Sequence, residues 1–93
     1  MPFTTEKTYR FRGTWNDVPG VYGIMNAQKQ MIYIGETDSF KRRMKEHQDD
    51  SGHCMHPYGP ELVWAEVIRG GEPARVARET ALISEYGPPC NVQ

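Results

Sequence analysis

Cysteine is scarce in this sequence, because Cys54 and Cys90 are the only two among 93 residues. Two cysteines exclude the framework of several disulfides that holds many small secreted domains together. They leave a single bridge open, but reduced thiols are the expected state in a cytosolic protein.

Long hydrophobic runs and a secretion signal are also missing. No apolar stretch approaches the roughly 20 residues that a membrane-spanning helix needs. The first six residues, MPFTTE, lack the basic and apolar parts of a signal peptide. We therefore expect a cytoplasmic protein with no membrane partner.

Neither sign of charge dominates the chain. The formal net charge is −1, and hydrophobic residues make up 38% of the sequence, which is typical of a globular domain. Residues 1–48 carry a net charge of +3 and residues 49–93 one of −4. A general binder of polyanions is usually basic overall, so any contact with nucleic acid is expected to be local.

Several strands can be read from the pattern. Aromatic and basic residues alternate over residues 9–12, which predicts a half-exposed edge strand. Its arginines are expected to be solvated, and a basic face for a phosphate backbone is the alternative. Further strands are predicted at residues 20–25, 30–34 and 62–68. An exposed Trp15 or the N-terminal strand is a candidate for a dimer contact, and the oligomeric state stays open.

A four-residue loop, residues 26–29, joins two of these strands in a predicted hairpin. If the loop is symmetric, Tyr22 lies opposite Tyr33. Directly opposed residues of an antiparallel pair point to the same face, so the two phenols would stand side by side. A one-residue bulge would break this register.

A short basic helix is expected after Asp38 and Ser39, whose side-chain oxygens suit an N-cap. Four of its residues recur at helical spacing and share one stripe: Phe40, Arg43, Met44 and His47. The arginine and the histidine are expected at the edge of the buried face, within reach of Tyr33. The other basic residues of the helix are candidates for nucleic-acid contacts: Lys41, Arg42 and Lys45.

A second helix is expected to begin near Pro73 and to end at Gly87. Glu79 lies on or beside its apolar stripe, which contains Val76, Ile83 and Tyr86. A carboxylate in such a position is rarely buried without a partner. An intrahelical pair with Arg75 is one explanation, and a functional carboxylate is the other.

The loop at residues 48–60 contains the run His53-Cys54-Met55-His56, which invites comparison with a set of metal ligands. A structural zinc ion needs four ligands, usually in pairs, and no second cluster in the sequence completes this one. The favoured interpretation is a loop without a metal.

The polar residues of the two helices and the hairpin suit a phosphodiester. Arg43 can hold a phosphate oxygen in a forked contact. Glu79 can anchor one Mg²⁺, which needs only one or two carboxylates and takes its other ligands from water and substrate. A phenol has a pKa of about 10 and is a poor base at neutral pH, but positive charge from the metal and Arg43 would lower that pKa.

Two tripeptides carry a resemblance to a known family. Gly20-Val21-Tyr22 is separated by ten residues from Tyr33-Ile34-Gly35. The pair resembles the signature of the GIY-YIG nucleases, with Val21 in place of the usual isoleucine. A helical arginine, a glutamate in the later helix and a trailing asparagine follow in the family's order, so the match covers about residues 19–92.

The resemblance implies a fold. The family fold is a small α/β (α+β) domain with a central three-stranded antiparallel sheet flanked by helices, here with an additional N-terminal edge strand. Residues 1–93 would then be a single domain, with an extension at 1–18 and the family core at 19–92. Family enzymes generally carry a further domain for DNA affinity and specificity, for which 93 residues leave no room.

The resemblance also implies roles for the polar residues. Tyr22 corresponds to the tyrosine that activates the attacking water, and Tyr33 is similar to a second tyrosine that orients the water or the phosphate. Arg43 matches the arginine that stabilises the scissile phosphate, and His47 matches a histidine that assists proton transfer.

Two further matches complete the implied site. Glu79 aligns with the sole protein ligand of one Mg²⁺ or Mn²⁺ ion, and Asn91 aligns with the asparagine that closes the motif set. The first hypothesis is therefore a metal-dependent endonuclease that hydrolyses nucleic acid, DNA rather than RNA, with a protein partner supplying specificity. The alternative is a non-catalytic module of the same fold that binds nucleic acid or a partner, which the acidic second half motivates.

Overall fold

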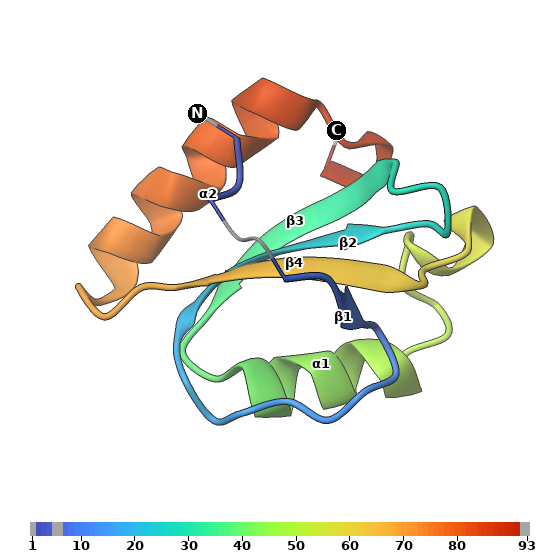
Figure 1. Ribbon diagram of the computed structural model, residues 1–93, viewed down its shortest axis with the longest axis horizontal. Helices are drawn as coiled ribbons and strands as arrows, with labels where there is room; N and C mark the ends of the chain where they lie inside the picture. Colours follow the sequence, from blue (N-terminus) through green and yellow to red (C-terminus); the bar gives the residue numbers. More distant parts are fainter. Residues whose placement is uncertain (1, 5–6, 92–93) are drawn as a thin grey trace.

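The computed structural model describes residues 2–4 and 7–91. Within these ranges, a four-stranded antiparallel sheet lies between two helices (Figure 1). The strands are β1 (Tyr9–Arg10), β2 (Gly20–Met25), β3 (Met31–Thr37) and β4 (Leu62–Val67), in the spatial order β1-β4-β2-β3. The helices are α1 (Phe40–Asp49) and α2 (Glu72–Tyr86), with short 3₁₀ turns η1 (His56–Tyr58) and η2 (Pro89–Asn91). The predicted fold is confirmed, and the additional edge strand is only two residues long.

The hairpin of β2 and β3 has a different register from the predicted one. Tyr22 lies opposite Gly35, and Tyr33 lies opposite Ile24. The register shifts by one residue between Ile24 and Met25, because Ile32 is an extra residue on β3. The prediction that Tyr22 faces Tyr33 directly was therefore wrong. Since the true offset is two residues, both tyrosines still point to the same face of the sheet.

The α1 face of the sheet holds the larger core. Ser39 is the N-cap of α1, and its side chain accepts a hydrogen bond of 3.2 Å from the backbone N–H of Arg42, as the sequence predicted. The helix packs Phe40 and Met44 against the sheet. The other buried members of this core are Phe11, Trp15, Tyr22, Ile24, Ile32, Met55 and Val63. Trp15 is only 9% exposed, so the expectation of an exposed tryptophan was wrong.

The α2 face holds a smaller core. Pro73 lies in the first turn of α2, and Gly87 ends the helix in the left-handed conformation, with its N–H bonded to the carbonyl of Ile83 at 2.8 Å. The buried residue of the helix is Leu82, which packs on Val21, Ile34 and Phe3. Val76 is 42% exposed, so the apolar stripe lies further round the helix than predicted.

The C-terminal turn is tied to the loop after α1 by a disulfide between Cys54 and Cys90, whose Cα atoms are 5.8 Å apart. This separation lies in the ordinary range for a bridge. The expectation of two reduced thiols was wrong for this structure, because the fold brings residues 36 positions apart into contact. No helix in the described part of the chain is long and apolar enough to cross a membrane.

Candidate active site

A buried pair, Tyr22 and His47, forms the inner part of the candidate site. The phenol oxygen of Tyr22 lies 2.7 Å from Nε2 of His47, and the two side chains are 0% and 1% exposed. Tyr22 comes from the middle of β2, and His47 from the third turn of α1. The sequence placed His47 at the edge of the buried face, but the pair with Tyr22 satisfies its ring nitrogen and lets it lie fully inside.

Burial controls the protonation of both groups. It lowers the pKa of His47 to about 3, with further lowering by the positive charge of Arg43 and by the other two histidines. His47 is therefore neutral at physiological pH. Burial and the neighbouring Tyr33 raise the pKa of Tyr22, while Arg43 acts in the opposite direction. The predicted effect of Arg43 on the phenol is present, but desolvation outweighs it.

Tyr33 lies diagonally across the hairpin from Tyr22. The ring centroids of the two tyrosines are 6.3 Å apart, and the Tyr33 ring is 5.6 Å from the ring of His47. Tyr33 is half-buried and lies on β3, the free edge strand of the sheet. His53, which the sequence did not suggest for this site, packs edge-on at 4.9 Å from both Tyr33 and His47.

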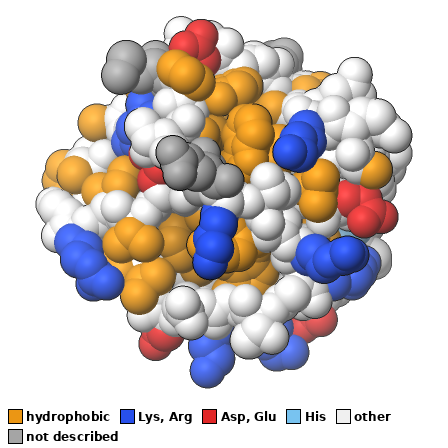
Figure 2. Space-filling model, viewed as in Figure 1, with side chains coloured by type: hydrophobic (Ala, Val, Ile, Leu, Met, Phe, Trp, Pro, Cys, Tyr) orange, Lys and Arg blue, Asp and Glu red, His pale blue; other side chains and the backbone are white. Residues whose placement is uncertain are grey.

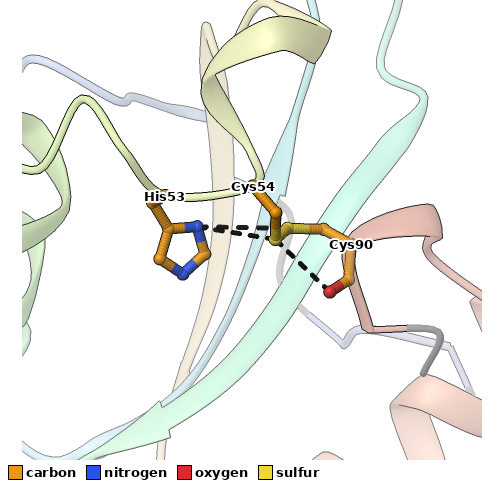
Figure 3. Close-up of side chains that lie close together, drawn as sticks. All are labelled: His53, Cys54 and Cys90. Atoms are coloured by element: carbon orange, nitrogen blue, oxygen red, sulfur yellow. Dashed lines mark hydrogen bonds between the residues drawn. A yellow bond between two sulfur atoms is a disulfide. The ribbon is translucent and has the colours of Figure 1, made fainter.

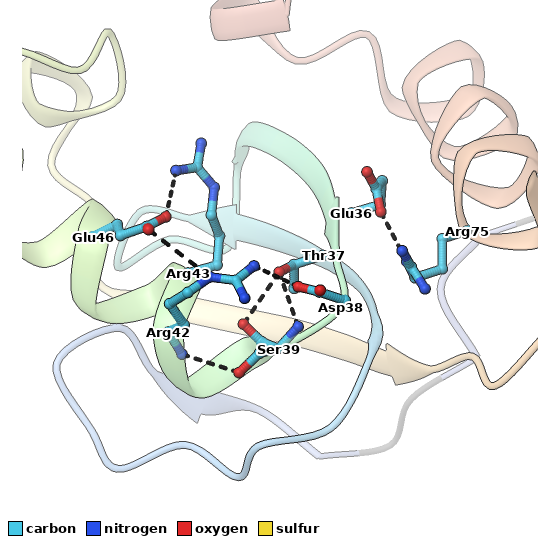
Figure 4. Close-up of polar contacts among 8 residues, drawn as sticks. All are labelled: Glu36, Thr37, Asp38, Ser39, Arg42, Arg43, Glu46 and Arg75. Carbon is cyan, nitrogen blue, oxygen red and sulfur yellow. Dashed lines mark hydrogen bonds and ion pairs between the residues drawn. The ribbon is translucent and has the colours of Figure 1, made fainter. Parts of the chain in front are cut away.

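Arg43 forms the outer wall of the site on the α1 side. Its Nη1 donates to Oε1 of Glu46 at 2.9 Å, and its side chain is 35% exposed. The positive charge of Arg43 and a side-chain hydrogen bond from it both act to lower the pKa of Tyr22. Figure 4 shows Arg43 and Glu46 on α1, with Glu36 and Arg75 across from them. These four side chains line an open polar hollow of about 400 Å³.

Glu79 approaches from α2. Burial raises the pKa of this carboxyl, and the negative charge of Glu36 raises it further, while a hydrogen bond from the backbone of Glu36 opposes both. Glu79 forms no ion pair with any other described residue. Arg75, the predicted helical partner, instead donates from Nε to Glu36 at 2.8 Å. The intrahelical explanation for Glu79 was therefore wrong.

After burial and the charge of Tyr33, the charge of Glu79 also raises the pKa of Tyr22. A half-buried carboxylate with a raised pKa and no cationic partner favours a cation beside it. Glu36 adds a second carboxylate to this environment. Glu36 was not among the predicted site residues, although its place directly after Gly35 at the end of the strand was a usable signal.

Asn91 uses its side chain to hold the edge strand. Its Oδ1 accepts from the backbone N–H of Ile34 at 2.8 Å, and its Nδ2 donates to the carbonyl of Ile34 at 2.9 Å. The amide thus takes the place of a neighbouring strand, between Tyr33 and Gly35. This geometry fixes β3 beside the site, and both hydrogen-bonding groups of the amide are engaged.

The remaining basic residues of α1 lie on its exposed side. Arg42 pairs with Asp38 and Glu46, and Lys45 pairs with Asp49 at 3.3 Å. Lys41 is exposed beside them. On the face that Figure 2 shows, Lys and Arg side chains are spread among hydrophobic and acidic ones. Exposed pairs of this kind contribute little stability, so these cations can exchange partners.

The predicted groups therefore surround the free edge of β3. Tyr22, Tyr33 and His47 lie on the α1 face of the sheet, and Arg43 closes that side. Glu79 reaches the same edge from α2, on the other face. In the described part of the chain β3 is the edge strand of the sheet, and the Asn91 amide covers the peptide groups of Ile34 on that edge.

The chain is similar to several known proteins. Residues 18–91 match the model of the GIY-YIG catalytic domain. UvrABC system protein C of Saccharopolyspora erythraea is 35% identical over an alignment of 95 residues. The alignment covers 92% of this chain and 13% of that protein. The corresponding protein of Pseudomonas savastanoi pv. phaseolicola is 28% identical over 85 residues, or 88% and 14% of the two chains. The chain thus spans about a seventh of these curated relatives.

Solved structures with the same fold include the GIY-YIG N-terminal endonuclease domain of UvrC from Thermotoga maritima. Its magnesium-bound form is 24% identical and covers 84% of this chain and 88% of that one, with a TM-score of 0.72. A point mutant of the same domain, bound to its catalytic divalent cation, is 23% identical with the same TM-score, and covers 85% and 88% of the two chains.

Proposed function

The chain belongs to the GIY-YIG family, and from this premise we propose that it is a divalent-metal-dependent endonuclease that hydrolyses DNA phosphodiesters. The observations that support the proposal are the 2.7 Å contact between Tyr22 and His47 and the electrostatic effects of Arg43 and Glu79 on the Tyr22 phenol. We propose that residues 19–92 form the catalytic core and that the protein is cytoplasmic, as expected from the sequence. We also propose that a protein partner delivers the DNA, which the pairing of the α1 cations with nearby carboxylates supports.

Glu79 is the residue that we propose to hold one Mg²⁺ or Mn²⁺ ion. Magnesium accepts a site with a single carboxylate because water and substrate oxygens complete its octahedron. The raised pKa of Glu79 and its lack of an ion pair among the described residues support this assignment. The bound ion would polarise the phosphate and stabilise the leaving oxygen.

The other side chains orient the reacting groups. Arg43 is proposed to hold a non-bridging phosphate oxygen, in exchange for its contact with Glu46. The phenol of Tyr22 and Nε2 of His47 share a hydrogen bond of 2.7 Å, and we assign its proton to the phenol, which directs the oxygen lone pairs away from the histidine. We assign this oxygen to the attacking water, whose proton it accepts as its own proton moves to His47. Tyr33 orients the same water or the phosphate, and Asn91 keeps β3 in position.

The basic residues of α1, Lys41, Arg42 and Lys45, are proposed to contact the phosphate backbone beside the scissile bond. Arg42 is paired with Asp38, just before the helix, and Lys45 with Asp49 within it, so DNA has to replace these partners. We therefore expect weak binding by the isolated chain, with a shallow dependence on salt.

A nicking assay tests the proposal. Purified protein is incubated with supercoiled plasmid, a branched DNA and an RNA of matching sequence, with Mg²⁺ or with a chelator. We expect cleavage of DNA only with metal, its loss in Glu79→Gln, and a decrease of about 10²–10³-fold in Arg43→Ala. Glu61→Gln and Arg69→Ala remove the same charges at exposed positions away from the site and should keep full activity.

Two results would overturn the proposal. Cleavage that Glu79→Gln leaves unchanged would mark a contaminating nuclease. Absence of cleavage on every substrate, together with tight DNA binding in fluorescence anisotropy, would favour the non-catalytic module. Cleavage of the RNA alone would keep the enzyme and change its substrate.

A further inference from the structure

Three potential metal ligands meet at the surface beside the active site. His53 and Cys54 belong to the loop after α1, and Cys90 belongs to η2, as Figure 3 shows. Their donor atoms all lie within 4.8 Å of one another. Nδ1 of His53 is 3.7 Å from Sγ of Cys54 and 3.9 Å from Sγ of Cys90. From the sequence alone the loop was expected to hold no metal, because no second cluster completes its ligands; Cys90, 36 residues after Cys54, was not among the candidate ligands.

We propose that His53, Cys54 and Cys90 form a zinc site when the disulfide between the two cysteines is reduced. Nδ1 of His53 and the two thiolates supply three ligands, and water takes the fourth position. This site is separate from the proposed metal ion at Glu79, and its existence does not depend on nuclease activity.

The spacing of the donor atoms fits a tetrahedral ion. Zinc–sulfur bonds of about 2.3 Å and zinc–nitrogen bonds of about 2.0 Å place ligand atoms of a tetrahedron roughly 3.5–3.8 Å apart. Both nitrogen-to-sulfur distances are already near this value. Only the two sulfur atoms have to separate once their bond is broken, and we expect rotation of the cysteine side chains to separate them.

The histidine is prepared to act as a ligand. The backbone N–H of Met55 points at Nδ1 of His53 at 3.3 Å, so this nitrogen carries a lone pair and the proton lies on Nε2. Zinc binds a neutral imidazole through this lone pair, so the ion would replace the hydrogen bond from Met55.

The redox step balances with a dithiol as reductant. Two electrons from the dithiol break the sulfur–sulfur bond of the protein, two protons convert Cys54 and Cys90 to thiols, and the reductant becomes a disulfide. Zinc then binds the two thiolates and releases both protons. Soft thiolate ligands select zinc over magnesium, whereas the carboxylate of Glu79 favours magnesium. The two sites therefore discriminate between the two ions by ligand chemistry.

Occupation of this site would keep the C-terminal turn attached under reducing conditions. Cys90 directly precedes Asn91, whose amide holds Ile34 on the edge strand. His53 packs at 4.9 Å against Tyr33 and His47, so zinc on its Nδ1 would also fix the ring beside the site. The bridge and the metal are thus two ways to make the same connection, one for each redox state.

Cobalt substitution tests the inference. The full chain is reduced with a phosphine, stripped of metal with a chelator, desalted without oxygen and titrated with Co²⁺. We expect thiolate-to-cobalt charge-transfer bands and the intense visible bands of tetrahedral cobalt, saturating near one equivalent and abolished by Zn²⁺. Cobalt on oxygen ligands at Glu79 would lack the charge-transfer bands, so Glu79→Gln should leave the signal unchanged.

Matched variants make the test specific. Cys90→Ser and His53→Asn should each lose the saturable signal, and His56→Asn, from the same loop, should retain it. Circular dichroism checks that each variant is folded. The inference is overturned if reduced wild-type protein shows only the pale absorption of aqueous Co²⁺, if His53→Asn titrates like the wild type, or if reduction exposes no thiols.

Discussion

Tyr22 lies directly opposite Gly35, and its phenol covers the place that a side chain at residue 35 would occupy. A Cβ built on Gly35 would collide with the hydroxyl and the ring of Tyr22. The second tripeptide therefore ends in glycine for a steric reason. The residue opposite the buried tyrosine has to lack a side chain so that the phenol can reach His47.

We predict that Gly35→Ala displaces the Tyr22 ring and loses both stability and activity. Overpacking of this kind typically costs about 1–3 kcal/mol, because the collision involves a buried ring rather than the end of a flexible chain. Urea unfolding measures the stability loss, and the nicking assay should fall with it. Gly52→Ala is the matched control, since a Cβ there meets only a side-chain oxygen of Asp50 at 3.5 Å. Equal stability of both variants would contradict the steric explanation.

The buried His47 predicts a loss of stability on mild acidification. Its pKa is about 3 in the folded protein and about 6.5 when unfolded. Between these values the unfolded chain binds a proton that the folded chain does not, so stability is present above pH 6.5 and falls as the pH decreases. One proton corresponds to about 1.4 kcal/mol per pH unit.

Replacing His47 with glutamine, which keeps a hydrogen-bonding partner for Tyr22, should flatten this dependence. Urea unfolding of both proteins between pH 7 and pH 5 measures it, and their difference cancels the contributions of the carboxyl groups. A shallower slope from His53 should remain, because its pKa is lowered as well. Parallel pH profiles for the two proteins would show that His47 is protonated in the folded state.

Asn91→Ala should free the edge strand locally. The variant loses two hydrogen bonds to Ile34, which we expect to cost about 1–2 kcal/mol in total. Hydrogen exchange followed by NMR should show faster exchange at the amide of Ile34. Gln48→Ala is the control, since Gln48 makes a comparable contact with the carbonyl of Phe11 on another part of the fold. An unchanged exchange rate at Ile34 would show that the Asn91 contact is not maintained in solution.

Glu36→Gln should weaken divalent-metal binding at neutral pH. The variant removes a negative charge near Glu79 and leaves Arg75 unpaired beside it, and both effects disfavour a cation. We expect the dissociation constant for Mn²⁺, measured by calorimetry, to rise about three- to tenfold, which corresponds to a Coulomb change of about 1 kcal/mol. Glu61→Gln should leave it unchanged, and equal binding by both variants would exclude a contribution from Glu36.

The sequence predicted the elements better than their mutual placement. Helix caps, such as Ser39 and Gly87, depend on local chemistry and were found from the pattern. The extra residue at Ile32 was not, since a bulge depends on packing across strands. Likewise, Arg75 pairs with the distant Glu36, whereas helical spacing suggested Glu79. Cys90 pairs with the distant Cys54, and no local pattern suggested that partner. His47 shows the same limit, because only the fold brings Tyr22 to its ring.

The edge position of β3 has a consequence for the behaviour of the protein in concentrated solution. An exposed edge strand offers unpaired peptide groups to other chains and invites sheet extension. In this protein that edge is also where the proposed catalytic groups meet, so one intruding strand would both start an aggregate and block the reaction. The side chain of Asn91 occupies the peptide groups of Ile34 and so hinders pairing with a strand of another chain. It thereby protects both solubility and access to the site.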